Sequence, residues 1–335
     1  MANDASVLST ASPVLEDLFI TDENKTMYFR HVLTAGLWQY GWPPLCMMGL
    51  VGNTLVLLVL RRDGLVRTSA NVYLSALAVG DSLELMVASL AAYPVYAWRL
   101  CLEDTTMWTR NCIWAVHHAL GNVSIWLIVA FTVERCVVVR FPLLKLRLCT
   151  PRNAGLCCGS LLVLAFVENI DLFFLDALST NATSGDVTCF VPLHYLDDVN
   201  VTRPGFNLVS VTVVPVCVVL FCNWAIISGL HRKLLPTAVR HPATRPTVMC
   251  LGVSFTFVVC VVPYHVIAVF GRYWPMTQPT RAAVVHSCLL LRYTNHAVNF
   301  FLYSLTGAHF RSELVALFRS STQRGDRLRP NMCVG

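Results

Sequence analysis

The amino-acid sequence predicts an all-α membrane protein, a bundle of seven transmembrane helices. The first observation is composition: of the 335 residues, 56% are hydrophobic and only 13% are charged, whereas water-soluble domains carry about 25% charged residues. The second observation is length, because a helix needs roughly 20 predominantly apolar residues to cross a bilayer. Seven windows of the chain meet that length; they lie at about 37–60, 71–97, 112–138, 154–175, 206–230, 246–270 and 282–305.

Residues next to the first and fourth windows affect how these two windows are interpreted. Residues 1–36 are polar and acidic and show no charged-then-apolar secretory signal, so we expect an N-terminal tail followed by a first span that acts as its own insertion signal. The fourth window is the weakest, because Glu168, Asp171 and Asp176 crowd its end. The seven windows together define a transmembrane domain over residues 37–305.

Composition also excludes other classes of protein. Most of the fourteen cysteines lie inside apolar runs, which is not the pattern of a secreted disulfide framework. The net charge of +6 is scattered over short loops, so it does not form a nucleic-acid-binding surface. We find no P-loop, zinc-protease or nucleophile-elbow motif. The chain is therefore not expected to be an enzyme or to bind nucleic acid.

The basic residues predict the orientation in the membrane. One set of connections and the C-terminal tail carry seventeen Lys and Arg, whereas the other set and the N-terminal tail carry seven. Lys and Arg are concentrated in cytoplasmic loops, so we expect an extracellular N-terminus. Glycosylation sequons at Asn24, Asn181 and Asn200 all fall on the predicted outer side.

Motifs in these spans resemble those of the rhodopsin-like (class A) G-protein-coupled receptors, from about Gly49 to Phe318. Each motif is weak alone, but their order and spacing together are specific. They are Gly52-Asn53, Asn71 to Asp81, Glu134-Arg135-Cys136, Pro215, Pro263, Asn299-Phe-Phe-Leu-Tyr303 and Phe310-Arg311. The resemblance implies an amphipathic eighth helix at 306–319 and a cytosolic tail at 320–335. Within the class, the closest likeness is to FMRFamide-type neuropeptide receptors, carried by stretches such as Asn122-Val-Ser-Ile-Trp-Leu and Asn295 to Tyr303.

The resemblance assigns Asp81 to a polar network in the middle of the membrane. In such receptors this network lines a water-filled pocket that binds sodium, and hard cations do prefer oxygen ligands with one carboxylate as countercharge. Its residues here are Asn53, Asp81, Ser124, Asn295 and Asn299. A sodium ion is the only metal or cofactor we expect. The alternative is a polar network that only ties helices together.

The resemblance also implies a switch at the cytosolic side. Glu134 would hold the guanidinium of Arg135 at rest, and its release would let Arg135 reach a G protein; the alternative is a snorkelling pair that anchors the helix end. Pro215 and Pro263 bend spanning helices because proline removes a backbone hydrogen bond. We interpret them as hinges, and we expect Tyr303 to move into the opened core.

Two buried charges are predicted to pair with each other. Glu84 lies one helical turn from Asp81 on the same face, and Arg292 lies about two turns from Asn299 on the neighbouring helix. Because an unpaired charge at this depth is costly, we predict a Glu84–Arg292 pair. It is either a ligand-sensitive salt bridge or a structural tie.

The ligand pocket is expected among the outer ends of helices 2, 3, 5, 6 and 7. His117 and His118 lie at pocket depth, but neighbouring helical residues point about 100° apart, so we favour pocket lining over metal binding. The predicted pocket residues are Glu84, His117, His118, Tyr264, His265, Arg292 and Tyr293.

On the outer side, Cys112 and Cys189 are predicted to form a disulfide, since the oxidising exterior permits it. The alternatives are that Cys101 replaces Cys112 as the partner of Cys189, or that all three cysteines remain free. The other cysteines are interpreted as reduced, small hydrophobic residues.

These observations predict a plasma-membrane receptor that binds an extracellular peptide and activates a heterotrimeric G protein, with lipid as its other partner. Acidic outer residues, namely Asp171, Asp186, Asp197 and Asp198, would steer a basic peptide. One alternative keeps the fold but recognises a small molecule or an odorant. The other is a transporter or channel, which would show two inverted halves with matched helix breaks; we see no such symmetry.

Overall fold

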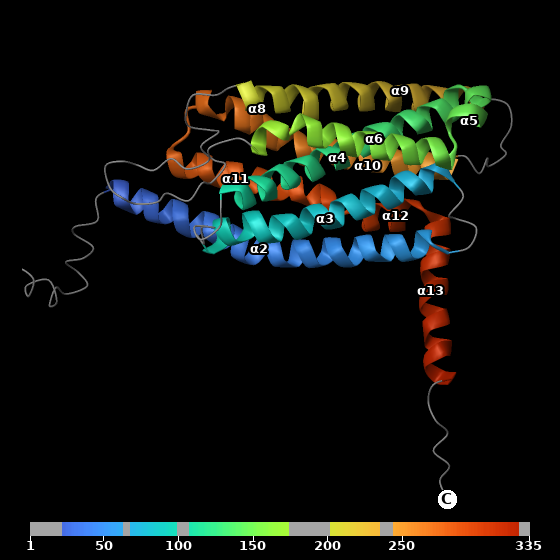
Figure 1. Cartoon of the computed structure of the whole chain (residues 1–335), viewed down its shortest axis with the longest axis horizontal. Coiled ribbons are helices and arrows are strands. Elements are labelled where there is room, and N and C mark those ends of the chain that lie inside the picture. Colours follow the sequence, from blue (N-terminus) through green and yellow to red (C-terminus); the bar gives the residue numbers. More distant parts are fainter. Residues whose placement is uncertain (1–21, 63–67, 99–106, 174–201, 235–243, 328–335) are drawn as a thin grey trace, which may run out of the picture.

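A computed structural model describes residues 22–62, 68–98, 107–173, 202–234 and 244–327. The described residues fold into helices joined by short turns, without a strand. Figure 1 shows the long helices lying side by side in one bundle, with α13 projecting from one end. The helices that form the bundle are α2 (Asp22–Leu60), α3 (Ser69–Trp98), α4 (Met107–Arg140), α6 (Pro151–Glu168), α9 (Val214–Leu234), α10 (Thr244–Phe270), α11 (Gln278–Ala297) and α12 (Asn299–Thr306).

The remaining elements connect or extend these helices. They are α5 (Pro142–Leu148), the 3-10 turns Ile170–Phe173 and Gly271–Tyr273, α8 (Thr202–Asn207), the π-helix Leu208–Val213 and α13 (Ala308–Arg327). Within the described residues, five helices are long and apolar enough to cross a membrane. A sixth is added if α5 and α6, which meet at a 69° bend, count as one span. The seventh predicted window is divided between α11 and α12, and α11 is less apolar because it carries Arg281 and Arg292.

The fold class that the sequence predicts is confirmed, but several helices are longer than their predicted segments, and the largest differences are at the start of α2 and the end of α13. α2 begins at Asp22, fifteen residues before the predicted span, although its apolar part starts at Leu33. α13 runs to Arg327 instead of residue 319. Both extensions continue a helix beyond its apolar part, which the apolar windows do not report.

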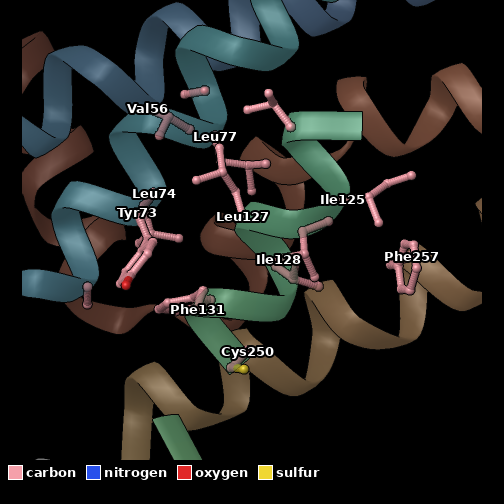
Figure 2. Close-up of a cluster of buried hydrophobic side chains, with 14 of the residues drawn as sticks. Val56, Tyr73, Leu74, Leu77, Ile125, Leu127, Ile128, Phe131, Cys250 and Phe257 are labelled. Carbon is pink, nitrogen blue, oxygen red and sulfur yellow. The ribbon is translucent and has the colours of Figure 1, made fainter. Parts of the chain in front are cut away.

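α4 is the central helix of the bundle. Of its apolar window, 72% is buried, against 28% to 50% for the other four candidate spans. Leu127, Ile128 and Phe131 of α4 pack in one apolar cluster with Tyr73, Leu74 and Leu77 of α3 and with Phe257 of α10 (Figure 2). Residues on α4 therefore contact most other elements of the bundle, and most of its polar side chains are buried as well.

Glycines let α2 approach the seventh helix closely. A Cβ on Gly52 would lie 2.9 Å from Cβ of Phe300, and one on Gly49 would lie 3.1 Å from Cβ of Ala297. Small residues at such crossings allow the van der Waals contact that holds helices together in lipid.

One backbone hydrogen bond and one arginine side chain stabilise the turn between α12 and α13. The N–H of Gly307 donates to the Tyr303 carbonyl at 2.8 Å, and a Cβ there would lie only 2.7 Å from that oxygen. Nη1 of Arg311 donates to the carbonyls of Ser304 and Leu305, at 3.0 and 2.9 Å. The guanidinium thus satisfies carbonyls at the end of α12 that have no helical partner.

Pro215 is the second residue of α9, which directly follows the π-helix Leu208–Val213. In that helix the N–H of Val214 donates to the carbonyl of Val209, five residues earlier. Such wide turns often occur at functional sites, and proline removes one further backbone donor. Pro263 lies inside α10. Both positions are backbone irregularities of the kind expected of hinges; the hinge role itself stays a prediction.

Candidate functional site

Three groups of buried polar side chains lie along the bundle. The first surrounds Glu84 near the start of α4, the second surrounds Asp81 at mid-bundle, and the third surrounds Arg135 near the end of α4. We call them the Glu84 cluster, the Asp81 network and the Arg135 site.

In the Glu84 cluster, the carboxylate pairs with a histidine. Glu84 of α3 is fully buried, with 0% of its surface exposed, and its Oε1 lies 3.4 Å from Nδ1 of His117 on α4. The two atoms are within ion-pair distance, but they do not form a hydrogen bond with each other. The other nitrogen of the same ring, Nε2, lies 3.0 Å from the hydroxyl of Tyr293 on α11. His117 therefore connects Glu84 of α3 with Tyr293 of α11.

The predicted Glu84–Arg292 ion pair is not formed among the described residues, so that prediction was wrong. The guanidinium of Arg292 instead lies over Gly121 of α4, where a Cβ would overlap Nη2 and would lie 3.3 Å from Oε1 of Glu84. The guanidinium is also 5.7 Å from the ring of Tyr264 and 5.8 Å from that of Tyr293. Cation–π contacts of this kind compensate for lost hydration, so Arg292 is held beside Glu84 by aromatic rings.

The cluster leaves hydrogen-bonding capacity unused. Both carboxylate oxygens of Glu84, Nδ1 of His117 and Nε of Arg292 have no hydrogen-bond partner among the described residues. Buried polar atoms in native proteins are nearly always hydrogen-bonded, and the exceptions call for an explanation. The arrangement is therefore able to accept and donate hydrogen bonds to a further group.

Aromatic side chains of α2 line one side of the cluster. Trp42 lies edge-on to Tyr293 with ring centroids 4.8 Å apart, and Trp38 donates from Nε1 to Nδ1 of His286 at 2.9 Å. Both tryptophans are fully buried. Sequence reasoning missed them, because a tryptophan in an apolar span gives no signal that separates a site from the core.

The remaining predicted pocket residues border this cluster. His118 is partly buried, with its ring 5.5 Å from that of His117. His265 is buried and packs 5.2 Å from Tyr264, with Nδ1 3.2 Å from the Val261 carbonyl. Among the described residues, no group of three or more His, Cys, Asp or Glu side chains could hold a metal ion. The seven predicted pocket residues thus come from α3, α4, α10 and α11 and meet in one region.

The Asp81 network contains a residue that sequence reasoning did not include. Oδ1 of Asp81 lies 2.7 Å from Nδ1 of His296, and Oδ2 accepts a hydrogen bond from Nδ2 of Asn299 at 2.6 Å. Asn53 donates from Nδ2 to the backbone carbonyl of His296 at 3.0 Å. Ser124 neighbours the carboxylate, yet its hydroxyl has no hydrogen-bond partner among the described residues.

Both oxygens of the Asp81 carboxylate, which a sodium ion would need, already have contacts within the chain. Hard cations bind oxygen ligands, and the two carboxylate oxygens contact nitrogen atoms of His296 and Asn299. Asn295 is buried, and its Nδ2 has no hydrogen-bond partner among the described residues. The signal available in the sequence was His296 itself, which directly follows Asn295 of the predicted network.

The Arg135 site holds its arginine beside its acidic neighbour. Arg135 and Glu134 form an ion pair, and Ser69 of α3 donates to Oε1 of Glu134 at 2.9 Å. The guanidinium also lies 5.4 Å from the ring of Phe131. All three polar side chains are buried, so the pair that the sequence predicts is present, with Ser69 as an additional partner.

α4 and α10 are joined next to this site. The hydroxyls of Thr132 and Ser254 lie 3.3 Å apart, and Sγ of Cys250 is 3.5 Å from the Thr132 oxygen. Tyr303 is buried nearby, 6.0 Å from the ring of Phe310, and its hydroxyl has no hydrogen-bond partner among the described residues. α10 therefore lies close to α4 in this state.

Several predictions on the outer side involve residues that the structure does not describe. Cys112 is an exposed, free cysteine, but its predicted partner Cys189 lies outside the described residues, so the disulfide stays a prediction from the sequence. The neighbouring Asn111 is buried and donates from Nδ2 to the Phe173 carbonyl at 3.2 Å. Cys101, Cys189, Asn181 and Asn200 lie outside the described residues, as does the side chain of Asn24.

An apolar helical bundle with buried charges defines an α-helical, multi-pass membrane protein. The family model of the seven-transmembrane receptors of the rhodopsin family matches residues 52–303, so the chain belongs to that family. The family consists of receptors, which agrees with the prediction that the chain is not an enzyme.

The chain is similar to galanin receptor type 2 of Mus musculus and of Homo sapiens. It is 27% identical to each over 286 residues, covering 79% of this chain and 71% or 68% of the relative. The likeness to FMRFamide-type receptors stays a prediction.

Proposed function

We propose that this receptor lies in the plasma membrane with its N-terminus outside, binds an extracellular peptide at the Glu84 cluster, and activates a heterotrimeric G protein at the Arg135 site. The similarity to galanin receptors supports a peptide as ligand. The distribution of Lys and Arg supports the orientation. In that orientation the Glu84 cluster lies toward the outer side and the Arg135 site toward the cytosol.

The observation that carries the proposal is the unused hydrogen-bonding capacity of the Glu84 cluster. The carboxylate of Glu84 and the guanidinium of Arg292 lie beside one glycine, Gly121, without pairing directly. A ligand amide offers an N–H for the carboxylate and a carbonyl for the guanidinium. Forming these bonds in a buried site is favourable because the partners are already desolvated.

Ligand binding would act on the relative positions of α3, α4 and α11. His117 contacts Glu84 on one side and Tyr293 on the other, so a ligand group that takes either partner changes the link between these helices. A ligand shifts an equilibrium only through its different affinity for the two states. The state that it favours would be the one in which α10 has moved away from α4.

Movement of α10 away from α4 would release the side chain of Arg135. Separation of α10 from α4 breaks the contact between Thr132 and Ser254. Loss of the Glu134 pair then frees a guanidinium that stays charged and offers several N–H donors. We propose that Arg135 contacts the G protein in this form, with Pro215 and Pro263 as hinges and Tyr303 moving into the opened core.

The test is a screen of a neuropeptide library on cells that express the full chain, with calcium and cyclic AMP as readouts. We expect at least one peptide to evoke a response, and Arg135→Ala to abolish the response while the labelled peptide still binds. A clear response to a lipid, an odorant or a metabolite alongside silence to every peptide would overturn the peptide assignment. A ligand-evoked current or substrate flux without G-protein activation would overturn the receptor mechanism.

A further inference from the structure

Asp81 is a fully buried carboxylate whose two oxygens are both occupied. Nδ1 of His296 lies 2.7 Å from Oδ1, and Asn299 donates to Oδ2 at 2.6 Å. Asp81 is on α3, His296 on α11 and Asn299 on α12. The three side chains are all buried, so the contacts are made away from water and connect the second helix with both parts of the seventh.

An ionised Asp81 makes the ring nitrogen a donor. A carboxylate only accepts hydrogen bonds, so Nδ1 of His296 must carry a proton that points at Oδ1. The amide nitrogen of Asn299 likewise directs an N–H at Oδ2. A cation that approaches Oδ1 from the side of His296 would meet the N–H hydrogen, and the imidazole would have to turn away before the cation could bind there.

Two other side chains of the network offer free oxygens. The Ser124 hydroxyl and Oδ1 of Asn53 are buried there without a hydrogen-bond partner among the described residues. Hard cations bind through oxygen atoms, including those of water, and a carboxylate supplies the countercharge. In the wild type these two neutral oxygens would have to hold the ion while the Asp81 carboxylate stays hydrogen-bonded to His296 and Asn299.

The buried carboxylate still requires compensation. An isolated buried ion is strongly destabilising unless an opposite charge or hydrogen bonds accompany it. His296 provides this from within the chain, and its backbone carbonyl is fixed by Asn53 at 3.0 Å. The imidazole is therefore held in place by helix α2 as well as by its own carboxylate partner.

We propose that His296 occupies the position beside Asp81 that a sodium ion would take, so this receptor does not bind sodium there and its stability does not respond to sodium. A smaller residue at position 296 removes the N–H and opens space next to Oδ1. The variant His296→Ser then has a carboxylate without compensation, an added hydroxyl oxygen, and the free oxygens of Ser124 and Asn53. It gains a sodium response that the wild type lacks.

The test measures the thermal unfolding midpoint of the purified full-length receptor in detergent, without ligand, in NaCl, KCl and choline chloride at equal ionic strength. We expect the wild-type midpoint to be the same in all three salts within about 1 °C. We expect His296→Ser to show a rise specific to sodium of about 3 °C or more, as binding to the folded state alone stabilises it. Because no ligand is used, the result is independent of the proposed peptide.

Two variants serve as matched controls. His296→Asn keeps an N–H that can donate to Asp81, so we expect no sodium response from it. Asp81→Asn combined with His296→Ser removes the carboxylate, so we expect the gained response to disappear. A sodium-specific rise in the wild type that Asp81→Asn abolishes would overturn the proposal. So would a folded His296→Ser that is as unresponsive as the wild type. If His296→Ser does not yield folded protein, the comparison of wild type with Asp81→Asn still decides.

Discussion

The hydroxyl of Tyr293 lies 3.0 Å from Nε2 of His117, and the same imidazole faces Glu84 through Nδ1. One histidine thus contacts the second and the seventh helices from the third. Since the three side chains are buried, a change at one of them is transmitted to the others by direct contact.

Tyr293→Phe is expected to weaken ligand potency while leaving the fold intact. The substitution removes one hydroxyl and leaves Nε2 of His117 without its partner; a hydrogen bond of this kind contributes about 0.5–1.5 kcal/mol, so potency should fall about two- to tenfold. Concentration–response curves for the activating peptide measure it. Tyr40→Phe is the matched control, because Tyr40 is exposed. Equal potency for wild type and Tyr293→Phe would show that the contact with His117 is not used in ligand response.

Gly121→Ala is expected to destabilise the receptor and to reduce ligand affinity. The added Cβ would overlap Nη2 of Arg292, and a buried side chain forced out of its position costs about 1–3 kcal/mol. The unfolding midpoint of purified protein and equilibrium binding of the labelled peptide are the two measurements. Gly80→Ala is a close control, since its Cβ would lie 3.5 Å from the Ser124 hydroxyl, an ordinary contact. If both variants behave like the wild type, Arg292 is not held against α4 as described.

Ser69→Ala is expected to raise signalling in the absence of ligand. Ser69 donates to the carboxylate oxygen of Glu134 that pairs with Arg135, so its loss leaves the resting ion pair with one partner fewer. A hydrogen bond to a charged group contributes about 1.5–3 kcal/mol, which is enough to increase basal activity severalfold. Basal G-protein activation at matched surface expression measures this. Ser228→Ala, at a partly buried serine whose hydroxyl donates to the Trp224 carbonyl of its own helix, should leave it unchanged. Unaltered or lower basal activity in Ser69→Ala would contradict a restraining role.

Cys112→Ser is expected to leave folding and surface expression unchanged. Cys112 is a free, exposed cysteine in α4, and exposed substitutions usually alter stability by less than about 0.5 kcal/mol. Surface labelling of intact cells and the unfolding midpoint of purified protein are the readouts. A loss of surface expression that matches the loss in Cys189→Ser would instead support the disulfide predicted from the sequence.

The sequence predicts the helices better than the pairing of the charges between them. Apolar windows locate the spans because each window depends on local composition alone. The partner of Glu84 depends on the rotation of three helices, which is why Arg292 was predicted and His117 was found. The pair of adjacent residues Glu134 and Arg135 was predicted correctly, since chain connectivity already places them together.

The contact of His296 with Asp81 was not predicted, because the family motif assigns no role to this histidine. The resemblance directs attention to Asp81, Asn295 and Asn299, and a histidine between the last two has no assigned role. Only the packing of α11 against α3 brings its Nδ1 within 2.7 Å of Asp81. In the same way, the sequence indicates only that Trp38 and Trp42 are core residues. Their contacts with His286 and Tyr293 form because α2 packs against α11.

The most direct test of the central claim is nucleotide exchange on a purified heterotrimeric G protein by the purified receptor, with and without the activating peptide. We expect the peptide-bound wild type to accelerate GTP binding to the G protein at least several-fold. Arg135→Ala should abolish this acceleration, whereas Arg140→Ala, at the last residue of α4, should retain most of it. If the wild type binds the peptide but does not accelerate exchange on any class of G protein, the mechanism proposed for the Arg135 site is contradicted.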